Sequence, residues 1–179
     1  MSVLIDRYTA EIEAIFAKYP DKRSAVLPAL YLAQETYGYI NDDAINDVAS
    51  LLDLEPTEVL SIAGFYTLFH EEPVGKYVLE ICNDLPCALR GADELVESTC
   101  RKLGIEKDGT TEDGLFTVKT VMCLAACDKA PMLQVNLRYE ENLDEEKIDV
   151  LIENLRKDDA DGAAPYFGVE AFKESLKRK

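Results

Sequence analysis

The sequence predicts a two-domain α+β protein, in which a helical bundle is followed by a sandwich of alternating strands and helices. Residues 1 to about 70 carry apolar side chains at helical spacing. Beyond residue 76, β-branched runs alternate with helical stretches, an order typical of an α/β layer. The stretch Glu71–Lys76 interrupts both patterns and contains Pro73 and Gly75, so it predicts the boundary. The expected parts are 1–72, 73–157 and 158–179.

Four helices are expected in the first part, and proline, glycine and short polar residues mark their ends. The first ends at Pro20, and the second follows a cap at Asp21 and ends at Gly38. The third begins near Asn41. Short connections between these helices favour an antiparallel bundle.

The fourth helix is expected from Thr57 to Phe69, after Pro56. Its side chains are apolar almost all round. A helix without a polar face is central to its bundle or covered by another chain, and the sequence leaves both alternatives open.

The second part predicts a β-α-β-β-α order. The expected strands and helices are Tyr77–Ile81, Ala88–Leu103, Phe116–Met122, Met132–Leu137 in a hairpin with Tyr139 and Glu140, and a last helix capped by Asp144. A right-handed crossover would place the first two strands side by side and parallel.

The end of the chain differs in composition from the rest. Residues 158–165 indicate a linker. The following residues combine apolar side chains with four basic ones, and they are listed here: Tyr166, Phe167, Val169, Phe172, Leu176, Lys173, Lys177, Arg178 and Lys179. This tail is either a frayed end or a segment that docks onto a partner.

Composition excludes several classes of function. The 179 residues have a formal net charge of −16, which argues against nucleic acid as a partner. No apolar stretch is long enough to enter a membrane, and Met1–Arg7 lacks the pattern of a secretory signal. Five cysteines without an export signal indicate a reducing compartment, in which metal binding or redox chemistry is favoured over structural disulfides. We expect the chain to be cytoplasmic.

Four of the five cysteines form two spaced pairs, Cys82-x4-Cys87 and Cys123-x3-Cys127. Each pair follows an expected strand, and parallel strands would bring both pairs to one edge of the sheet. Four thiolates are the usual ligand set of an iron–sulfur centre, and the spacing favours a [2Fe–2S] cluster. The sequence predicts that these four cysteines bind both the metal and the cluster.

Other sites built on cysteine fit this pattern less well. A structural zinc site usually has C-x2-C knuckles, and it stays an alternative, as a zinc-stabilised interaction module. A thioredoxin-type dithiol requires C-x-x-C, which is absent, and disulfides conflict with the odd number of cysteines. Plant-type ferredoxin spacing fails because Arg90 stands where its third cysteine would be.

The remaining cysteine and the single histidine are expected to have no catalytic role. Cys100 shares a helical face with apolar residues and is expected in the core. His70 is expected on the surface or in an interface. No residue of the chain is predicted to be catalytic.

Several motifs together resemble one family. They are Leu27–Glu35, Phe65-Tyr66-Thr67, Pro73-Val74-Gly75-Lys76, the first cysteine pair with Pro86, Cys123-Leu124-x-Ala126-Cys127 and Ala130-Pro131-Met132. Across residues 5–157 the chain resembles the thioredoxin-like [2Fe–2S] E subunits of bacterial NADH:quinone oxidoreductase (respiratory complex I), homologous to the mitochondrial small flavoprotein-arm subunit. The resemblance implies a thioredoxin-like second domain, with Cys82, Cys87, Cys123 and Cys127 as cluster ligands.

The resemblance also implies partners and a location. The chain would lie beside a larger flavoprotein subunit that binds FMN and NADH, among other subunits of the peripheral arm at the cytoplasmic face of the membrane. No glycine fingerprint for NADH occurs in the chain, so no NADH or flavin site is expected on it. Related subunits serve NAD-linked hydrogenases and formate dehydrogenases, and the sequence does not separate these assemblies. Acidic residues near the cysteines, Glu80, Asp84 and Asp128, predict a low reduction potential.

Overall fold

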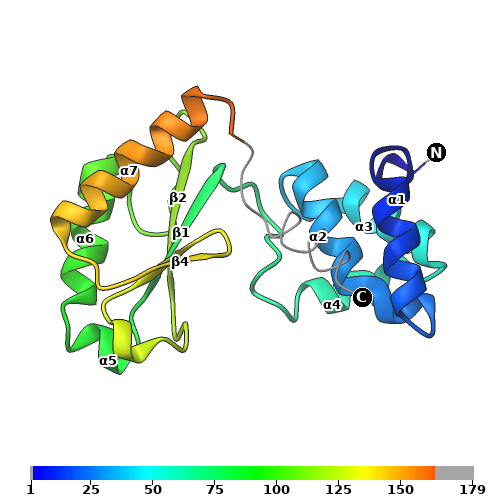
Figure 1. The fold of residues 1–179 in the computed structure, drawn as a ribbon, viewed down its shortest axis with the longest axis horizontal. Coiled ribbons are helices and arrows are strands. Elements are labelled where there is room, and N and C mark those ends of the chain that lie inside the picture. The colour runs from blue at the N-terminus through cyan, green and yellow to red at the C-terminus, as the bar shows by residue number, and fades with distance from the viewer. Residues whose placement is uncertain (1, 164–179) are drawn as a thin grey trace. The chain divides into compact units, whose positions relative to one another are not determined.

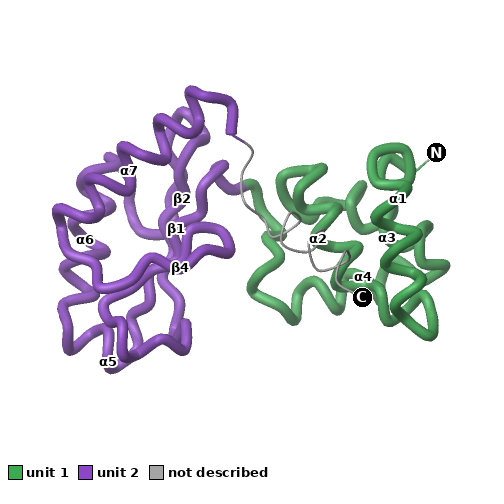
Figure 2. The backbone as a smooth tube through the Cα atoms, in the orientation of Figure 1, with its two compact units in different colours: residues 1–73, 167–179 green, residues 74–166 purple. Residues whose placement is uncertain are grey.

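The computed structural model describes residues 2–163. These residues form two compact units that divide between Pro73 and Val74, coloured separately in Figure 2. The first unit is helical, and the second is built on a four-stranded sheet (Figure 1). Mixed helical and sheet content is therefore confirmed, while the predicted domain limits stay a prediction. The predicted tail, from Tyr166 on, lies outside the described residues.

The helices of the first unit begin and end at the residues that the sequence marks. Asn41 accepts a hydrogen bond from the backbone N–H of Ala44, and Gly38, with φ of 82°, ends the second helix. Asp21 caps a short 3-10 helix that precedes that helix. The elements are α1 (Val3–Lys18), η1 (Lys22–Ala25), α2 (Val26–Tyr37), α3 (Asp42–Leu52) and α4 (Pro56–Ala63).

A buried carboxylate ties three of these helices together. Asp47 in α3 accepts hydrogen bonds from the backbone N–H of Leu4 and from the hydroxyl of Tyr37, each 3.0 Å long. The Leu4 N–H has no partner within its own helix, because it lies in the first turn of α1. Desolvation, with the hydrogen bond and charge of Asp47, raises the pKa of Tyr37 to about 12.

The prediction for the fourth helix is partly wrong, because α4 ends at Ala63 and not at Phe69. Beyond Gly64 the chain continues in turns, closed by hydrogen bonds from Phe65 N–H to Ile62 and from Tyr66 N–H to Ala63. Phe65 is 78% exposed. A groove of about 420 Å³ beside it is lined by Arg23, Ser24, Val26, Leu27, Ser61, Ile62, Phe65 and Tyr66.

The segment after these turns is fixed by a buried polar network, and His70 belongs to it. The Gln34 side chain accepts from the His70 N–H (2.8 Å) and donates to the Leu68 carbonyl (3.0 Å). The His70 carbonyl accepts from the N–H of Ile40. Because these bonds satisfy the backbone of an irregular segment, His70 is buried, at 7% exposure, and not on the surface.

The second unit has the predicted strand order. Its sheet runs β2-β1-β3-β4, with β1 and β2 parallel and the other pairs antiparallel. Helices α6 and α7 lie on the same side of the sheet (Figure 1). The elements are β1 (Tyr77–Cys82), α5 (Leu85–Ala88), α6 (Ala92–Leu103), β2 (Phe116–Val121), η2 (Cys127–Lys129), β3 (Leu133–Val135), β4 (Arg138–Glu140) and α7 (Glu145–Ala160).

Two helix limits differ from the prediction. The stretch expected as one helix from Ala88 is divided into α5 and α6, because Gly91 takes a left-handed conformation with φ of 89°. The last helix continues to Ala160, three residues into the predicted linker. A salt bridge of 2.6 Å between Lys76 and Asp159 attaches this extra turn to the start of β1.

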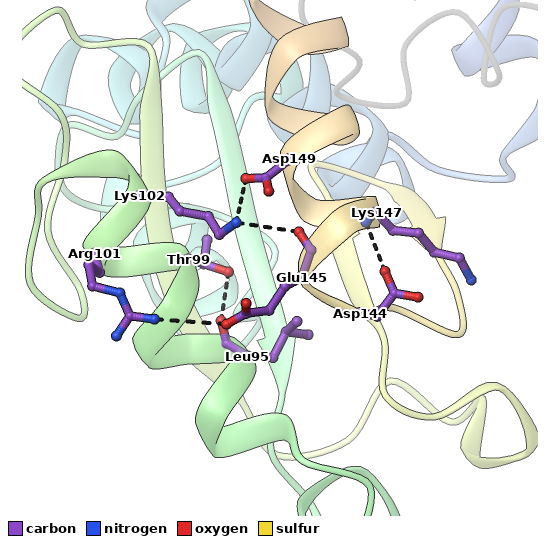
Figure 3. Close-up of polar contacts among 8 residues, drawn as sticks. All are labelled: Leu95, Thr99, Arg101, Lys102, Asp144, Glu145, Lys147 and Asp149. Carbon is purple, nitrogen blue, oxygen red and sulfur yellow. Dashed lines mark hydrogen bonds and ion pairs between the residues drawn. The ribbon is translucent and has the colours of Figure 1, made fainter.

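Helices α6 and α7 are joined by ion pairs at the surface (Figure 3). Lys102 pairs with Asp149 and donates to the Glu145 carbonyl (3.4 Å), and Arg101 lies 3.8 Å from the Glu145 carboxylate. Exposed pairs of this kind stabilise a protein by only about 0–1 kcal/mol each. The apolar side chains between the helices and the sheet therefore provide most of the stability of this contact.

No helix within residues 2–163 has the length and apolar character required to cross a membrane.

We predict that Asp47→Ala lowers the free energy of unfolding of the helical unit by about 2–3 kcal/mol, because it leaves two buried donors without an acceptor. Urea denaturation followed by far-ultraviolet circular dichroism measures the change. Asn46→Ala, at the exposed neighbouring position of α3, is the control and is expected to change stability little. Equal stability of both variants would contradict the role given to Asp47.

Candidate metal centre

The four paired cysteines lie at one edge of the sheet of the second unit. Cys82 is the last residue of β1, and Cys123 follows the end of β2 by two residues. Because the two strands are parallel and Cys82 pairs with Val121, both cysteines are at the carboxyl ends of neighbouring strands. Cys87 lies in α5, and Cys127 is the first residue of η2.

Electrostatic contacts link the four thiols in pairs. Burial, together with a hydrogen bond and the charge of Cys82, raises the pKa of Cys87 to about 11. The pKa of Cys127 is also raised, by desolvation and then by the charge and hydrogen bond of Cys123. The charge of Cys127 acts on Cys87, and the charge of Cys82 acts on Cys127, so the two pairs are neighbours.

The two pairs differ in their exposure to water. Cys82 and Cys87 are 3% and 1% exposed, whereas Cys123 and Cys127 are exposed. The inner pair lies in an apolar cluster whose other members are Ala92, Ala130 and Met132, with Leu124 and Ala126 packed against it. One side of the site is thus shielded from water and the other is open to it.

Backbone hydrogen bonds hold the first cysteine loop. Asp84 caps α5 by accepting from the Leu85 N–H (2.9 Å), and the Asn83 N–H donates to the Val121 carbonyl (3.0 Å). The Met132 backbone donates to the thiol of Cys87 and lowers its pKa. A thiol that accepts from an N–H group is prepared to carry the negative charge of a metal ligand.

The second cysteine loop has a less common backbone. Ala125 has φ of 58°, a left-handed conformation that is unusual for a residue other than glycine. Its N–H donates to the sulfur of Cys123 at 3.4 Å. The Leu124 carbonyl accepts from the hydroxyl of Tyr139 at 2.8 Å, which attaches the loop to β4.

Among residues 2–163, no three His, Cys, Asp or Glu side chains are grouped so as to hold a metal ion. A structural zinc site needs such a group, since four ligands surround one ion. A two-iron core instead takes two thiolates at each iron, which matches two neighbouring pairs of thiols. The donor set of this site therefore fits a [2Fe–2S] cluster better than a single ion.

Glu80 is the nearest buried carboxyl group in sequence to the site, two residues before Cys82. Desolvation raises its pKa to about 7, against the charge of Lys119 and a hydrogen bond of 3.2 Å from Gln134. At neutral pH it carries only part of a negative charge. Its contribution to a low reduction potential is smaller than its sequence position indicates.

Comparison with known proteins identifies the family. Residues 12–156 match the sequence profile of the thioredoxin-like [2Fe-2S] ferredoxins. The chain belongs to this family. The resemblance stated from the sequence is confirmed, and so is a thioredoxin-like domain.

Relatives in two genera are E subunits of the same enzyme. The chain is 45% identical over 146 residues to the second E subunit of the NADH-quinone oxidoreductase of Rhizobium meliloti (strain 1021), covering 82% of this chain and 87% of that protein. It is 42% identical over 149 residues to the E subunit of the NADH-quinone oxidoreductase of Rickettsia typhi (strain ATCC VR-144 / Wilmington), covering 82% and 88%.

A solved structure extends the likeness to another enzyme. The crystal structure of an NAD+-reducing [NiFe]-hydrogenase in the air-oxidized state matches with a TM-score of 0.66 and 26% identity. The match covers 74% of this chain and 23% of the hydrogenase chain, so the present chain corresponds to about a quarter of that longer one.

The structure brings together the four cysteines that the sequence singles out and keeps the fifth apart. Cys100 is 9% exposed in the core between the sheet and its helices, as predicted. The sequence did not indicate Ala125, Met132 and Tyr139, which contact the cysteine loops through hydrogen bonds that involve backbone groups. Only the position of Ala125 and Met132 beside the cysteines could have pointed to them, and Tyr139 gave no signal.

We predict that Cys123→Ser alters or removes the iron–sulfur spectrum of the chain, because a serine oxygen replaces one soft sulfur ligand. Cys100→Ser is the matched control and is expected to keep the spectrum, since its side chain lies in the core. Ultraviolet–visible absorption and electron paramagnetic resonance after iron and sulfide reconstitution measure both. Loss of the signal in Cys100→Ser would refute the ligand assignment.

Proposed function

We propose that this chain is the electron-transfer subunit of an NADH dehydrogenase complex of the complex I type, holding one [2Fe–2S] cluster with Cys82, Cys87, Cys123 and Cys127. The observation that carries the proposal is the meeting of two cysteine pairs, one buried and one exposed, at a single sheet edge. Family membership and the names of the relatives support it.

The cluster would supply one-electron redox chemistry when bound, and the chain would position it. Cys82 and Cys87 would anchor its inner side in the apolar cluster, which excludes water from these two sulfurs. Cys123 and Cys127 would hold its outer side at the surface, where a partner can approach. This placement suits a carrier that exchanges electrons with another subunit.

The partner in this proposal is the larger flavoprotein subunit, with FMN and NADH bound to it. A flavin takes up the two electrons of a hydride together and releases them singly, so it requires a one-electron carrier close by. Apolar side chains border the exposed cysteines: Leu85, Leu89 and Met122 are 67%, 77% and 81% exposed. Large exposed apolar side chains grouped on one surface are typical of a protein interface.

We also propose the domain limits 1–72, 73–157 and 158–179, in a two-domain arrangement, and a place in the peripheral arm at the cytoplasmic face of the membrane. The division of the described residues between Pro73 and Val74 supports the first limit. The groove beside Phe65 offers a second apolar surface, which we assign to other subunits of the arm.

A second candidate function is the equivalent subunit of an NAD-linked hydrogenase or formate dehydrogenase. The likeness to a chain of the NAD+-reducing hydrogenase supports this alternative. The curated relatives favour the complex I type, because they are 41–45% identical whereas the hydrogenase chain is 26% identical. The proteins that copurify with the chain from its native host distinguish the two assemblies.

The function is tested by metal and sulfide analysis of the chain purified without oxygen. We predict a reddish-brown protein with about two irons and two acid-labile sulfides per chain. A colourless protein with zinc as its only metal would contradict the proposal and support a zinc-stabilised interaction module.

The partner surface is tested by Met122→Lys. A charged side chain in the middle of an apolar contact is expected to weaken binding of the flavoprotein subunit at least about tenfold. The control is Val150→Lys in α7, where an exposed apolar side chain is replaced away from the cysteine loops. Copurification of both variants with the tagged flavoprotein subunit, each with a full cluster, measures the effect. Equal recovery would refute the assignment of this surface.

A further inference from the structure

A chain of two hydrogen bonds connects a tyrosine on β4 to one of the proposed ligands. The hydroxyl of Tyr139 donates to the carbonyl of Leu124 at 2.8 Å. The N–H of Ala125 donates to the sulfur of Cys123 at 3.4 Å. The Leu124 carbonyl and the Ala125 N–H belong to the same peptide group, so both bonds act on one dipole.

Hydrogen bonds in such a chain polarise one another. A donor at the carbonyl oxygen withdraws electron density through the planar amide and makes its N–H a stronger donor. A stronger N–H bond to a ligand sulfur favours the more negative, reduced state of an iron–sulfur centre. The hydroxyl can therefore influence the sulfur of Cys123 without touching it.

The geometry of the loop makes this peptide dependent on its outside partner. Ala125 is left-handed, with φ of 58°, and this conformation is costly for a residue with a side chain. Cys123 is exposed, and water competes for its sulfur. The Tyr139 contact fixes the orientation of the 124–125 peptide, because β4 is itself held by pairing of Tyr139 with Gln134 in β3.

We propose that Tyr139 is a positioning residue that raises the reduction potential of the cluster through the Leu124–Ala125 peptide and the sulfur of Cys123. The proposal rests on the proposed function, since it concerns the cluster that these cysteines would hold. It adds a tuning residue 12 positions beyond the last ligand, Cys127, on a strand that contributes no ligand.

The test compares the reconstituted full-length chain with Tyr139→Phe, which removes only the hydroxyl. The expected result is a full cluster whose reduced-to-oxidised ratio at a fixed potential falls about twofold, roughly 20 mV at about 59 mV per tenfold change. The effect is small because Tyr139 is 48% exposed, and water can replace part of the lost bond. Redox titration followed by electron paramagnetic resonance gives the potential, and resonance Raman spectroscopy gives the iron–sulfur(Cys) stretching frequencies, which are expected to shift with it.

Two further variants separate tuning from general structure. Tyr77→Phe removes a buried hydroxyl that has no hydrogen-bond partner, at the opposite end of β1 from Cys82, and should leave the potential unchanged. Replacement of Tyr139 by 3-fluorotyrosine makes the hydroxyl a stronger donor and should raise the potential, at a pH where the hydroxyl stays protonated. Opposite shifts for the phenylalanine and fluorotyrosine variants are the result expected of this hydrogen-bond chain.

Several results would overturn the inference. Equal potentials for the wild-type chain, Tyr139→Phe and the fluorotyrosine variant would overturn it and leave the proposed function intact. Loss of the cluster from a folded Tyr139→Phe would also overturn it, because the bond would then hold the loop and not tune it. A wild-type chain that takes up no iron would refute the proposed function, and the inference with it.

Discussion

The parallel pairing of β1 with β2 is the constraint on which the candidate site depends. Six consecutive pairs, from Tyr77 with Phe116 to Cys82 with Val121, fix the register of the two strands. A slip of one residue would turn every side chain of β1 to the other face of the sheet. The buried side chains of Leu79 and Ile81 would then leave the core beneath α6 and α7. Packing of the core thus fixes where Cys82 ends relative to Cys123, although the two are far apart in sequence.

The site combines two environments that are set by different kinds of interaction. The inner pair is positioned by burial among apolar side chains, with the Met132 N–H directed at Cys87. The outer pair has little burial, and hydrogen bonds determine its loop instead. Inner ligands of this kind tolerate little change in side-chain volume, whereas the outer loop depends on its backbone partners. The buried Glu80, with its pKa raised to about 7, adds less negative charge than Asp84 and Asp128 would lead one to expect from the sequence alone.

Local chemistry explains which features of the fold were predictable. Asn41 and Gly38 mark helix ends because capping and left-handed conformations are encoded by single residues. The break at Gly91 was missed because the apolar spacing continues across it, and the end of α4 was missed because the residues after Gly64 are as apolar as those before it. The four cysteines were predictable from spacing and residue type. The role of Tyr139 was not, because its hydroxyl contacts a backbone carbonyl 15 residues away, and no side chain at that position records the contact.

Exposed apolar side chains around the outer cysteines conflict with the needs of a free soluble chain, and the charge of the chain resolves the conflict. Leu85, Leu89 and Met122 are more than half exposed on the loops that carry the cysteines or beside them. Such a surface favours association with any apolar partner. A net charge of −16 opposes association between copies of the chain, since like charges repel. The same charge attracts a partner with a basic surface and orients it during encounter. The apolar rim then provides affinity only for a partner whose own charges are complementary, which makes contact beside the exposed cysteines selective.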